Sequence, residues 1–183
     1  IATNVGLKVN MNTKNNKRRR ESVERIKKAF FDELQKKELS QIKVSDICKL
    51  ASINRSTFYA NFLDIYDLAD KIYEELKNEV AQMFDLKTDL TNCLHEFHAL
   101  FEHIQAHRET YACYFRLGYE RQQWRVDNFF EIKNALNETG LDYRVEFFRS
   151  GFNAIVRIWL SNGCKETPQQ MCDILLSEYR GRI

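Results

Sequence analysis

The stretch 43–62 most narrows what this chain can fold into, because it predicts two short helices joined by a tight turn. Ile47 and Leu50 are one helical turn apart in the first helix, and Phe58 and Phe62 are one turn apart in the second. Apolar spacing of this kind also fits a plain pair of packed helices. The polar residues between the apolar positions decide between the two interpretations.

The second of these helices carries a polar side, which consists of Arg55, Ser56, Thr57, Tyr59 and Asn61. A helix that only filled a core would not need this side, whereas a helix that reads bases in the major groove of DNA does. Asn54, directly before the helix, is placed to cap it by accepting from the free N–H groups there. The stretch therefore predicts a DNA-binding helix–turn–helix.

The charge of the chain is unevenly distributed, although its net value is only +2. Residues 11–62 hold 13 Lys and Arg against 6 Asp and Glu, which gives +7, and residues 63–183 hold 14 against 20, which gives −6; Lys8 supplies the remaining +1. A basic segment followed by an acidic one indicates a polyanionic partner for the first segment alone.

Three consecutive arginines, Arg18, Arg19 and Arg20, begin a predicted helix over 18–37. Positive charge at a helix N-terminus opposes the helix dipole, so these arginines do not serve helix stability. They are either a solvated helix end or contacts to phosphate, and we expect phosphate contacts.

The fold is predicted to be all-α, because the chain has only 6 Gly and 1 Pro and no useful strand-like alternation. Apolar residues at helical spacing predict further helices over 64–84, 89–106, 109–120, 123–138, 142–162 and 168–180. We therefore expect a flexible arm over 1–17, a helical domain over 18–63 that contains the helix–turn–helix, and a second helical domain over 64–183; the family resemblance described next implies that the second domain binds a ligand and forms the dimer.

The sequence resembles the TetR family of bacterial transcription regulators. The resemblance is specific over 18–84 and looser over 85–183, and it is carried by Val44–Ala51, Ser56–Phe62, Tyr66–Leu68, Phe148-x-x-Gly151, Trp159–Gly163 and Thr167–Pro168. It implies an all-helical homodimer with a DNA-binding head and a larger body that holds an effector cavity and the dimer interface.

The resemblance also implies roles for single residues. Arg55, Ser56, Thr57 and Tyr59 match positions that touch bases or phosphates, Asn61 falls where the family often has a phosphate-binding histidine, and Ser45 lies where the preceding helix meets phosphate. With Lys43 and the three arginines, the expected DNA-binding set is Arg18, Arg19, Arg20, Lys43, Ser45, Arg55, Ser56, Thr57, Tyr59 and Asn61. Two positions depart from the family: Ser52 replaces the common turn glycine, and Ile65 replaces a phosphate-binding lysine.

The second half of the chain predicts two further sites. Flat apolar side chains with a few polar tips are typical of a small-molecule cavity, and the expected lining is Phe97, Phe101, Tyr111, Tyr114, Phe115 and Trp124. Such a cavity would take a small apolar or aromatic effector, although the same rings can also be ordinary core. The helix over 142–162 has two apolar stripes, more than one core requires. We expect a four-helix dimer bundle whose interface includes Phe148, Gly151, Phe152, Ile155, Trp159, Met171 and Leu175.

Several classes of function find no support in the sequence. No nucleophile elbow, phosphate loop or metalloprotease motif is present, so we expect neither an enzyme nor a cofactor. The five cysteines are scattered and the four histidines do not converge, which speaks against a metal site. No apolar run of membrane-spanning length and no signal peptide is visible, so we expect a cytoplasmic protein without membrane contact.

These expectations lead to one functional hypothesis and one alternative. The first is a sequence-specific DNA-binding transcription regulator, a ligand-responsive homodimeric repressor that binds a palindromic operator. The alternative is a protein-interaction coregulator whose DNA-binding head is degenerate, for which Ser52 and Ile65 are the only support.

Overall fold

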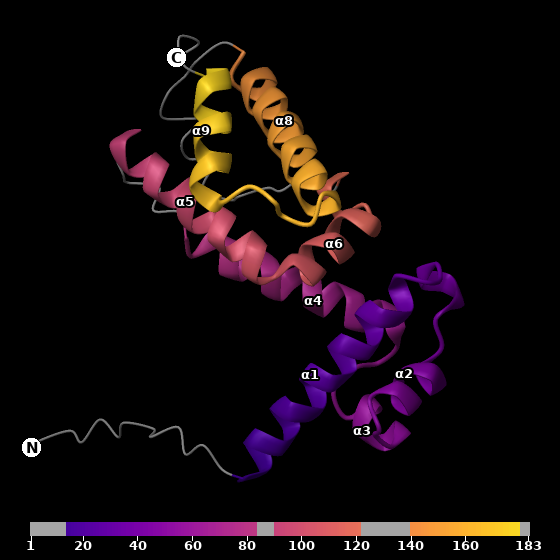
Figure 1. The fold of residues 1–183 in the computed structure, drawn as a ribbon. Coiled ribbons are helices and arrows are strands. Elements are labelled where there is room, and N and C mark those ends of the chain that lie inside the picture. The colour runs from indigo at the N-terminus through magenta and orange to yellow at the C-terminus, as the bar shows by residue number, and fades with distance from the viewer. Residues whose placement is uncertain (1–13, 84–89, 122–139, 180–183) are drawn as a thin grey trace, which may run out of the picture. The chain divides into compact units, whose positions relative to one another are not determined.

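The computed structural model describes residues 14–83, 90–121 and 140–179, and in these ranges every regular element is a helix (Figure 1). The all-α prediction is confirmed. The chain divides into two compact units at a point inside helix α4. We call residues Ile1–Ala69 the head and residues Asp70–Ile183 the body.

The head contains α1 (Lys14–Leu34), a short 3₁₀ helix η1 (Leu39–Gln41), α2 (Val44–Leu50), α3 (Arg55–Tyr59) and the first residues of α4 (Ile65–Ala81). Its core is apolar and contributed by all four α-helices: Ile26, Phe30, Leu34, Ile47, Phe58, Phe62, Ile65 and Leu68 are buried. Helix α2 packs against both α1 and α3. The apolar positions that predicted these helices therefore face one shared core, with one exception. Leu50, the last residue of α2, keeps 51% of its accessible surface and does not belong to the core.

The bounds of α1 differ from the expected 18–37. The helix begins at Lys14, because Lys14–Lys17 contains no helix breaker and the helix extends into part of the expected arm. It ends at Leu34, where the carbonyl of Glu33 accepts the N–H groups of both Lys36 and Lys37 at 3.0 Å and turns the chain.

Helix α4 starts with two reciprocal hydrogen bonds. The Asp64 carboxylate accepts from the N–H of Asp67, and the Asp67 carboxylate accepts from the N–H of Leu63, each at 2.8 Å. Together they satisfy two donors that a helix N-terminus otherwise leaves open. Ile65, one of the two departures from the family pattern, is buried beside this cap and serves the head core.

The body contains the rest of α4, α5 (Leu90–Ala106), α6 (Arg108–Arg116), a 3₁₀ helix η2 (Tyr119–Arg121), α8 (Leu141–Ser161) and α9 (Pro168–Tyr179). Helix α5 packs against α6 and α9, and α6 packs against α8. The expected helix over 109–120 is shorter, because Gly118 adopts φ +73° and ends α6. The helix expected over 123–138 lies outside the described residues.

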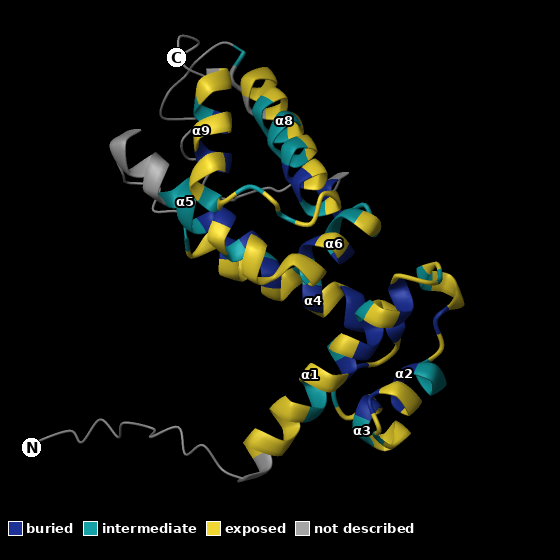
Figure 2. Ribbon diagram, viewed as in Figure 1, coloured by how far each residue is buried: buried dark blue, intermediate teal, exposed yellow. Residues whose placement is uncertain are grey.

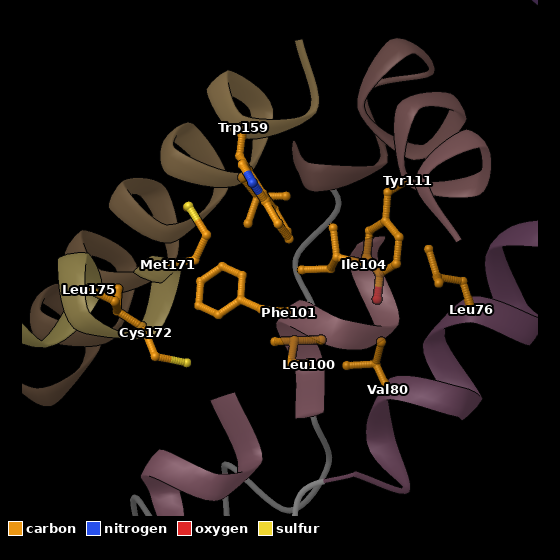
Figure 3. Packing of buried hydrophobic residues seen from close by; sticks show 11 residues of the cluster. Leu76, Val80, Leu100, Phe101, Ile104, Tyr111, Trp159, Met171, Cys172 and Leu175 are labelled. Atoms are coloured by element: carbon orange, nitrogen blue, oxygen red, sulfur yellow. The ribbon is translucent and has the colours of Figure 1, made fainter. Parts of the chain in front are cut away.

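The core of the body is centred on Phe101 and Trp159 (Figure 3). Their rings meet edge to face with centroids 5.6 Å apart, and the indole N–H of Trp159 donates to the carbonyl of Glu166 at 3.1 Å. A capping box opens α9: Thr167 and Gln170 exchange hydrogen bonds of 2.8 and 3.2 Å. Among the described helices, none is long and apolar enough to cross a membrane.

Candidate nucleic-acid interface

The turn between α2 and α3 is tight because Ser52 adopts a left-handed conformation with φ +52°. Helix α2 ends in a Schellman motif, in which the N–H of Ile53 donates to the carbonyl of Cys48 at 3.0 Å and the N–H of Ser52 donates to that of Lys49 at 3.3 Å. A glycine would adopt this φ at lower cost. The serine nevertheless preserves the turn.

Helix α3 turns one side inward and leaves the other to solvent (Figure 2). Phe58 is completely buried, and its ring packs on Phe62 with centroids 5.6 Å apart. Arg55 and Ser56 are exposed, and Tyr59 retains 54% of its accessible surface. The polar side expected from the sequence is therefore open to an external partner.

The hydrogen bond expected from the side chain of Asn54 is not made. Asn54 occupies the N-cap position with an extended backbone, but its side chain does not cap α3. The reason is that its own backbone carbonyl accepts the N–H of Thr57 at 3.0 Å, the group that a capping side chain would bind. The side chain of Asn54 instead lines a surface hollow.

Four of the residues expected to bind DNA lie around one surface groove of the head, which we call the α2–α3 groove. Its volume is about 420 Å³, and its lining includes Lys43, Ser45, Arg55 and Tyr59. Tyr66, at the start of α4, also lines this groove and is 54% exposed. The sequence analysis did not single out Tyr66, although its place in the family motif could have indicated it.

Arg19 and Asn61 form a linked pair that joins α1 to the end of α3. The Nε of Arg19 donates to the amide oxygen of Asn61 at 2.8 Å, and the amide nitrogen of Asn61 donates to the carbonyl of Thr57 at 2.8 Å. This arrangement fixes the plane of the Arg19 guanidinium and leaves its two terminal nitrogens to other acceptors. Asn61 thus holds the Arg19 side chain in place. Asn61 is also half-exposed itself.

The cationic side chains of the head differ in whether they have an acidic partner. Lys36 and Lys37 pair with Glu33, at 3.9 and 2.5 Å, and Lys37 also pairs with Asp46 at 3.2 Å. These hydrogen bonds, first to Glu33 and then to Asp46, raise the pKa of Lys37. By contrast, the five expected DNA-binding cations form no ion pair with any described residue: Arg18, Arg19, Arg20, Lys43 and Arg55. Their charge is available to an external anion.

The aromatic residues expected to line an effector cavity pack on one another in the body. Phe101 is fully buried against Phe152 and Trp159, and Phe97 lies 5.7 Å from Phe148 between ring centroids. Tyr114 meets Phe115 edge to face, and Tyr111 is buried. Burial is the main reason that the pKa values of Tyr111 and Tyr114 are raised. Trp124 lies outside the described residues.

The body has a surface hollow with a polar lining. It has a volume of about 430 Å³ and is lined by Glu120, Arg149, Ser150, Asn153, Ala154 and Arg157. Glu120 joins its two arginines, because its carbonyl accepts from Arg149 and its carboxylate accepts from Arg157 at 2.9 Å. Both guanidinium groups thus have partners within the body.

One histidine of the body is held between two polar partners. The Nδ1 of His103 lies 2.9 Å from the Tyr111 hydroxyl, and its Nε2 lies 3.2 Å from the Glu79 carboxylate. Burial, followed by the neighbouring His107, lowers the pKa of His103. Neutral imidazole suits both contacts, since one nitrogen can accept from Tyr111 and the other can donate to Glu79.

The expected dimer-interface residues prove to belong largely to the body core. Trp159, Met171 and Leu175 are at most 3% exposed, and Phe148, Phe152 and Ile155 pack against that core. The second apolar stripe of α8 is the exposed one: Phe147 keeps 65% of its surface and Ile158 keeps 61%. The buried residues therefore do not present their own surface to a partner. A dimer interface on α8 would instead use the exposed stripe, to which Gly151 also belongs.

The comparisons with known proteins agree with this fold. The family model "Transcriptional regulator C-terminal region", of the TetR type, matches residues 91–177. A TetR transcriptional regulator from Streptococcus agalactiae 2603V is similar in structure, with a TM-score of 0.59 and 21% identity over 90% of this chain and 96% of that one. The fatty acid degradation regulator FadR from Bacillus halodurans gives a TM-score of 0.61 at 16% identity over 87% and 95%.

A third similar structure is the dihydroxyacetone kinase operon activator DhaS, with a TM-score of 0.50 and 22% identity over 88% of this chain and 96% of that one. No curated protein sequence matches the chain. At these identities the structural likeness establishes the fold. The helix–turn–helix head and the matched C-terminal region define a DNA-binding transcription regulator. The family model and the similar structures together support a TetR-family transcriptional regulator.

Proposed function

We propose that this regulator is a homodimeric repressor that binds a palindromic operator and releases it when a small effector enters the body. The observation that carries the DNA-binding part is the set of five head cations without an ion pair, three of which belong to α1. Each phosphate that they neutralise releases condensed counterions and so adds to affinity.

The polar side of α3 is the proposed reader of bases. Arg55 and Tyr59 line the α2–α3 groove and are exposed, and bidentate contacts from arginine to guanine are the most common form of direct readout. Lys43 and Ser45, on the same groove, are placed to position the head on the backbone. Ser52 preserves the turn and Ile65 fills the core, so neither departure now favours the coregulator alternative.

The proposed dimer uses the exposed stripe of α8. Phe147, Ala154 and Ile158 lie on one side of that helix, and all three are exposed. A contiguous apolar stripe on the surface of a protein marks an interaction site. TetR-family regulators are typically dimeric, so a second copy of this chain is the occupant that we propose for the stripe.

The proposed signal from the body reaches α4 through Tyr119. The Tyr119 hydroxyl donates to the Asp70 carboxylate at 2.8 Å, and the Tyr119 ring stacks on Tyr73 with centroids 4.5 Å apart. Both partners lie on α4, the helix that continues into the head. An effector that displaced Tyr119 would therefore release α4 and change the separation of the two reading helices.

We propose a small apolar or aromatic effector that enters between the aromatic rings of the body. Because Phe101 and Tyr111 are already packed, such a ligand must separate these rings from their neighbours. Addition of an effector should then raise the melting temperature of the protein and lower its affinity for DNA.

The test of the proposed function is selection of duplex DNA from a random pool, followed by a gel shift and analytical ultracentrifugation. We expect a palindromic sequence bound by two copies of the chain. Enrichment of no sequence, together with no retention on duplex DNA at low salt, would favour the coregulator alternative.

A further inference from the structure

The head has a further surface hollow, which we call the turn pocket. It lies where α1, the end of α2, the α2–α3 turn and the start of α3 meet, and its volume is about 440 Å³. The residues that line it are Ser22, Arg25, Cys48, Lys49, Ser52, Ile53, Asn54 and Thr57. Of these, only Thr57 belongs to the DNA-binding set expected from the sequence, so the pocket is a distinct candidate site.

The turn pocket carries two positive charges and no acidic residue in its lining. Arg25 is exposed, and its hydrogen bonds reach only neutral acceptors, the Glu21 carbonyl and the Ser22 hydroxyl, both at 3.4 Å. Lys49 is exposed as well. Neither side chain forms an ion pair with a described residue. The pocket therefore suits a small anionic group.

Two neutral side chains of the lining add hydrogen-bonding capacity. Asn54 is one of the residues that line the pocket, and its side chain makes no capping hydrogen bond to α3. Ser52 is exposed and holds φ +52°, where a non-glycine residue is strained. The strained serine is explained if its hydroxyl is needed in the pocket, because glycine would form the same turn at lower cost.

We propose that the turn pocket binds one phosphodiester group of the DNA backbone. Arg25 and Lys49 supply the charge, and Ser52 and Asn54 supply hydrogen bonds. The proposal rests on the proposed DNA-binding function and adds to it a contact that fixes the position of the head and carries no sequence information. Thr57 belongs to both the pocket and α3, so the bound phosphate would lie beside the helix that reads the bases.

The proposal is tested by the salt dependence of binding to a duplex of random sequence. The magnitude of the slope of log Kobs against log salt concentration falls by about 0.9 for each phosphate contact that is lost. We expect the double variant Arg25→Gln/Lys49→Gln to lower the magnitude of the slope by about 0.9. Since both cations serve one phosphate, each single variant should lower the magnitude of the slope by no more than the double variant does.

The matched control is Lys36→Gln, which removes one charge from a lysine of the head that is already paired with Glu33. Its slope should equal that of the wild type. Melting temperatures of all variants should also match, because Arg25, Lys49 and Lys36 are exposed. An unchanged slope in the double variant, while the wild type binds DNA, overturns the pocket and leaves the proposed function intact. Absence of any salt-dependent binding by the wild type overturns both.

Ser52→Gly provides an independent check, since it removes the hydroxyl and relieves the left-handed strain. We expect the melting temperature to stay the same or rise, while affinity for duplex DNA falls several-fold. A purely structural role for Ser52 would leave affinity unchanged or improve it, and that result counts against the pocket.

Discussion

The head and the body handle their cations in opposite ways. In the body, Arg149 and Arg157 each have an internal acidic partner, Glu146 and Glu120. In the head, the three arginines at 18–20 on α1, and Lys43 and Arg55 around the α2–α3 groove, have no such partner among the described residues. The body also leaves Phe147 and Ile158 exposed on one side of α8. This difference is the basis for the two partners that we propose, a polyanion for the head and a second copy of the chain for the body.

The largest expected effect comes from Trp159→Ala, which tests whether Trp159 belongs to the core or to an interface. Removal of a buried tryptophan should lower the free energy of unfolding by about 3–5 kcal/mol, as measured by denaturant titration at several protein concentrations. Tyr143→Ala, at an 83% exposed position, is the control and should change little. A small effect of Trp159→Ala at low protein concentration would place this residue in the interface after all.

The next effect concerns the exposed stripe of the body. Ile158→Asp places a charge in the proposed apolar interface and should weaken dimerisation by about 2 kcal/mol or more, as measured by sedimentation equilibrium. The folded protomer should keep its helical circular dichroism, because Ile158 is 61% exposed. The control is Gln105→Asp, at an exposed position of α5, which should leave dimerisation unchanged. A dimer of normal stability in the Ile158 variant would exclude this stripe.

The reading side of the head should give a moderate effect. Tyr59→Ala and Arg55→Ala should each weaken binding to the selected operator by about 1–3 kcal/mol, as measured by gel shift, with the melting temperature unchanged. Lys36→Ala, which removes a paired cation, should leave affinity nearly the same. Undiminished affinity of both α3 variants would mean that another element reads the bases.

The smallest effect should come from Asn61→Ala, which tests the link to Arg19. Loss of the hydrogen bond to Arg19 should cost about 0.5–1.5 kcal/mol of DNA affinity. Because Asn61 acts through Arg19, Arg19→Ala and the double variant should be nearly equal in affinity. Additive losses in this double-mutant cycle would show that Asn61 contacts DNA independently of Arg19.

For a helix with a single apolar stripe, the sequence was enough to predict both the helix and the side that faces the core. Ile47 and Phe58, for example, occupy the core that their spacing indicated. In α8, two adjacent stripes were equally apolar, and only packing shows that the stripe with Trp159 faces inward and the one with Ile158 faces outward. Periodicity cannot rank two faces of similar hydropathy.

The contacts that organise the candidate interface could not be predicted from the sequence, because they join residues that are far apart in the chain. Arg19 and Asn61 are 42 residues apart and meet only because α1 packs on the helix–turn–helix. The side chain of Asn54 does not cap α3, because the N–H of Thr57 donates to the Asn54 backbone carbonyl instead. Local composition cannot predict which of the two acceptors is used. Likewise, Arg25 and Lys49 share a pocket that exists only after three elements have come together.

The most direct test of the contrast between head and body is the salt dependence of duplex DNA binding by the wild-type protein. Five unpaired cations that each neutralise one phosphate, together with the one phosphate proposed for the turn pocket, predict a slope of log Kobs against log salt of about −5.4 for each head. A slope near zero would mean that the cations of the head do not bind phosphate, and it would contradict the account of this chain as a DNA-binding regulator.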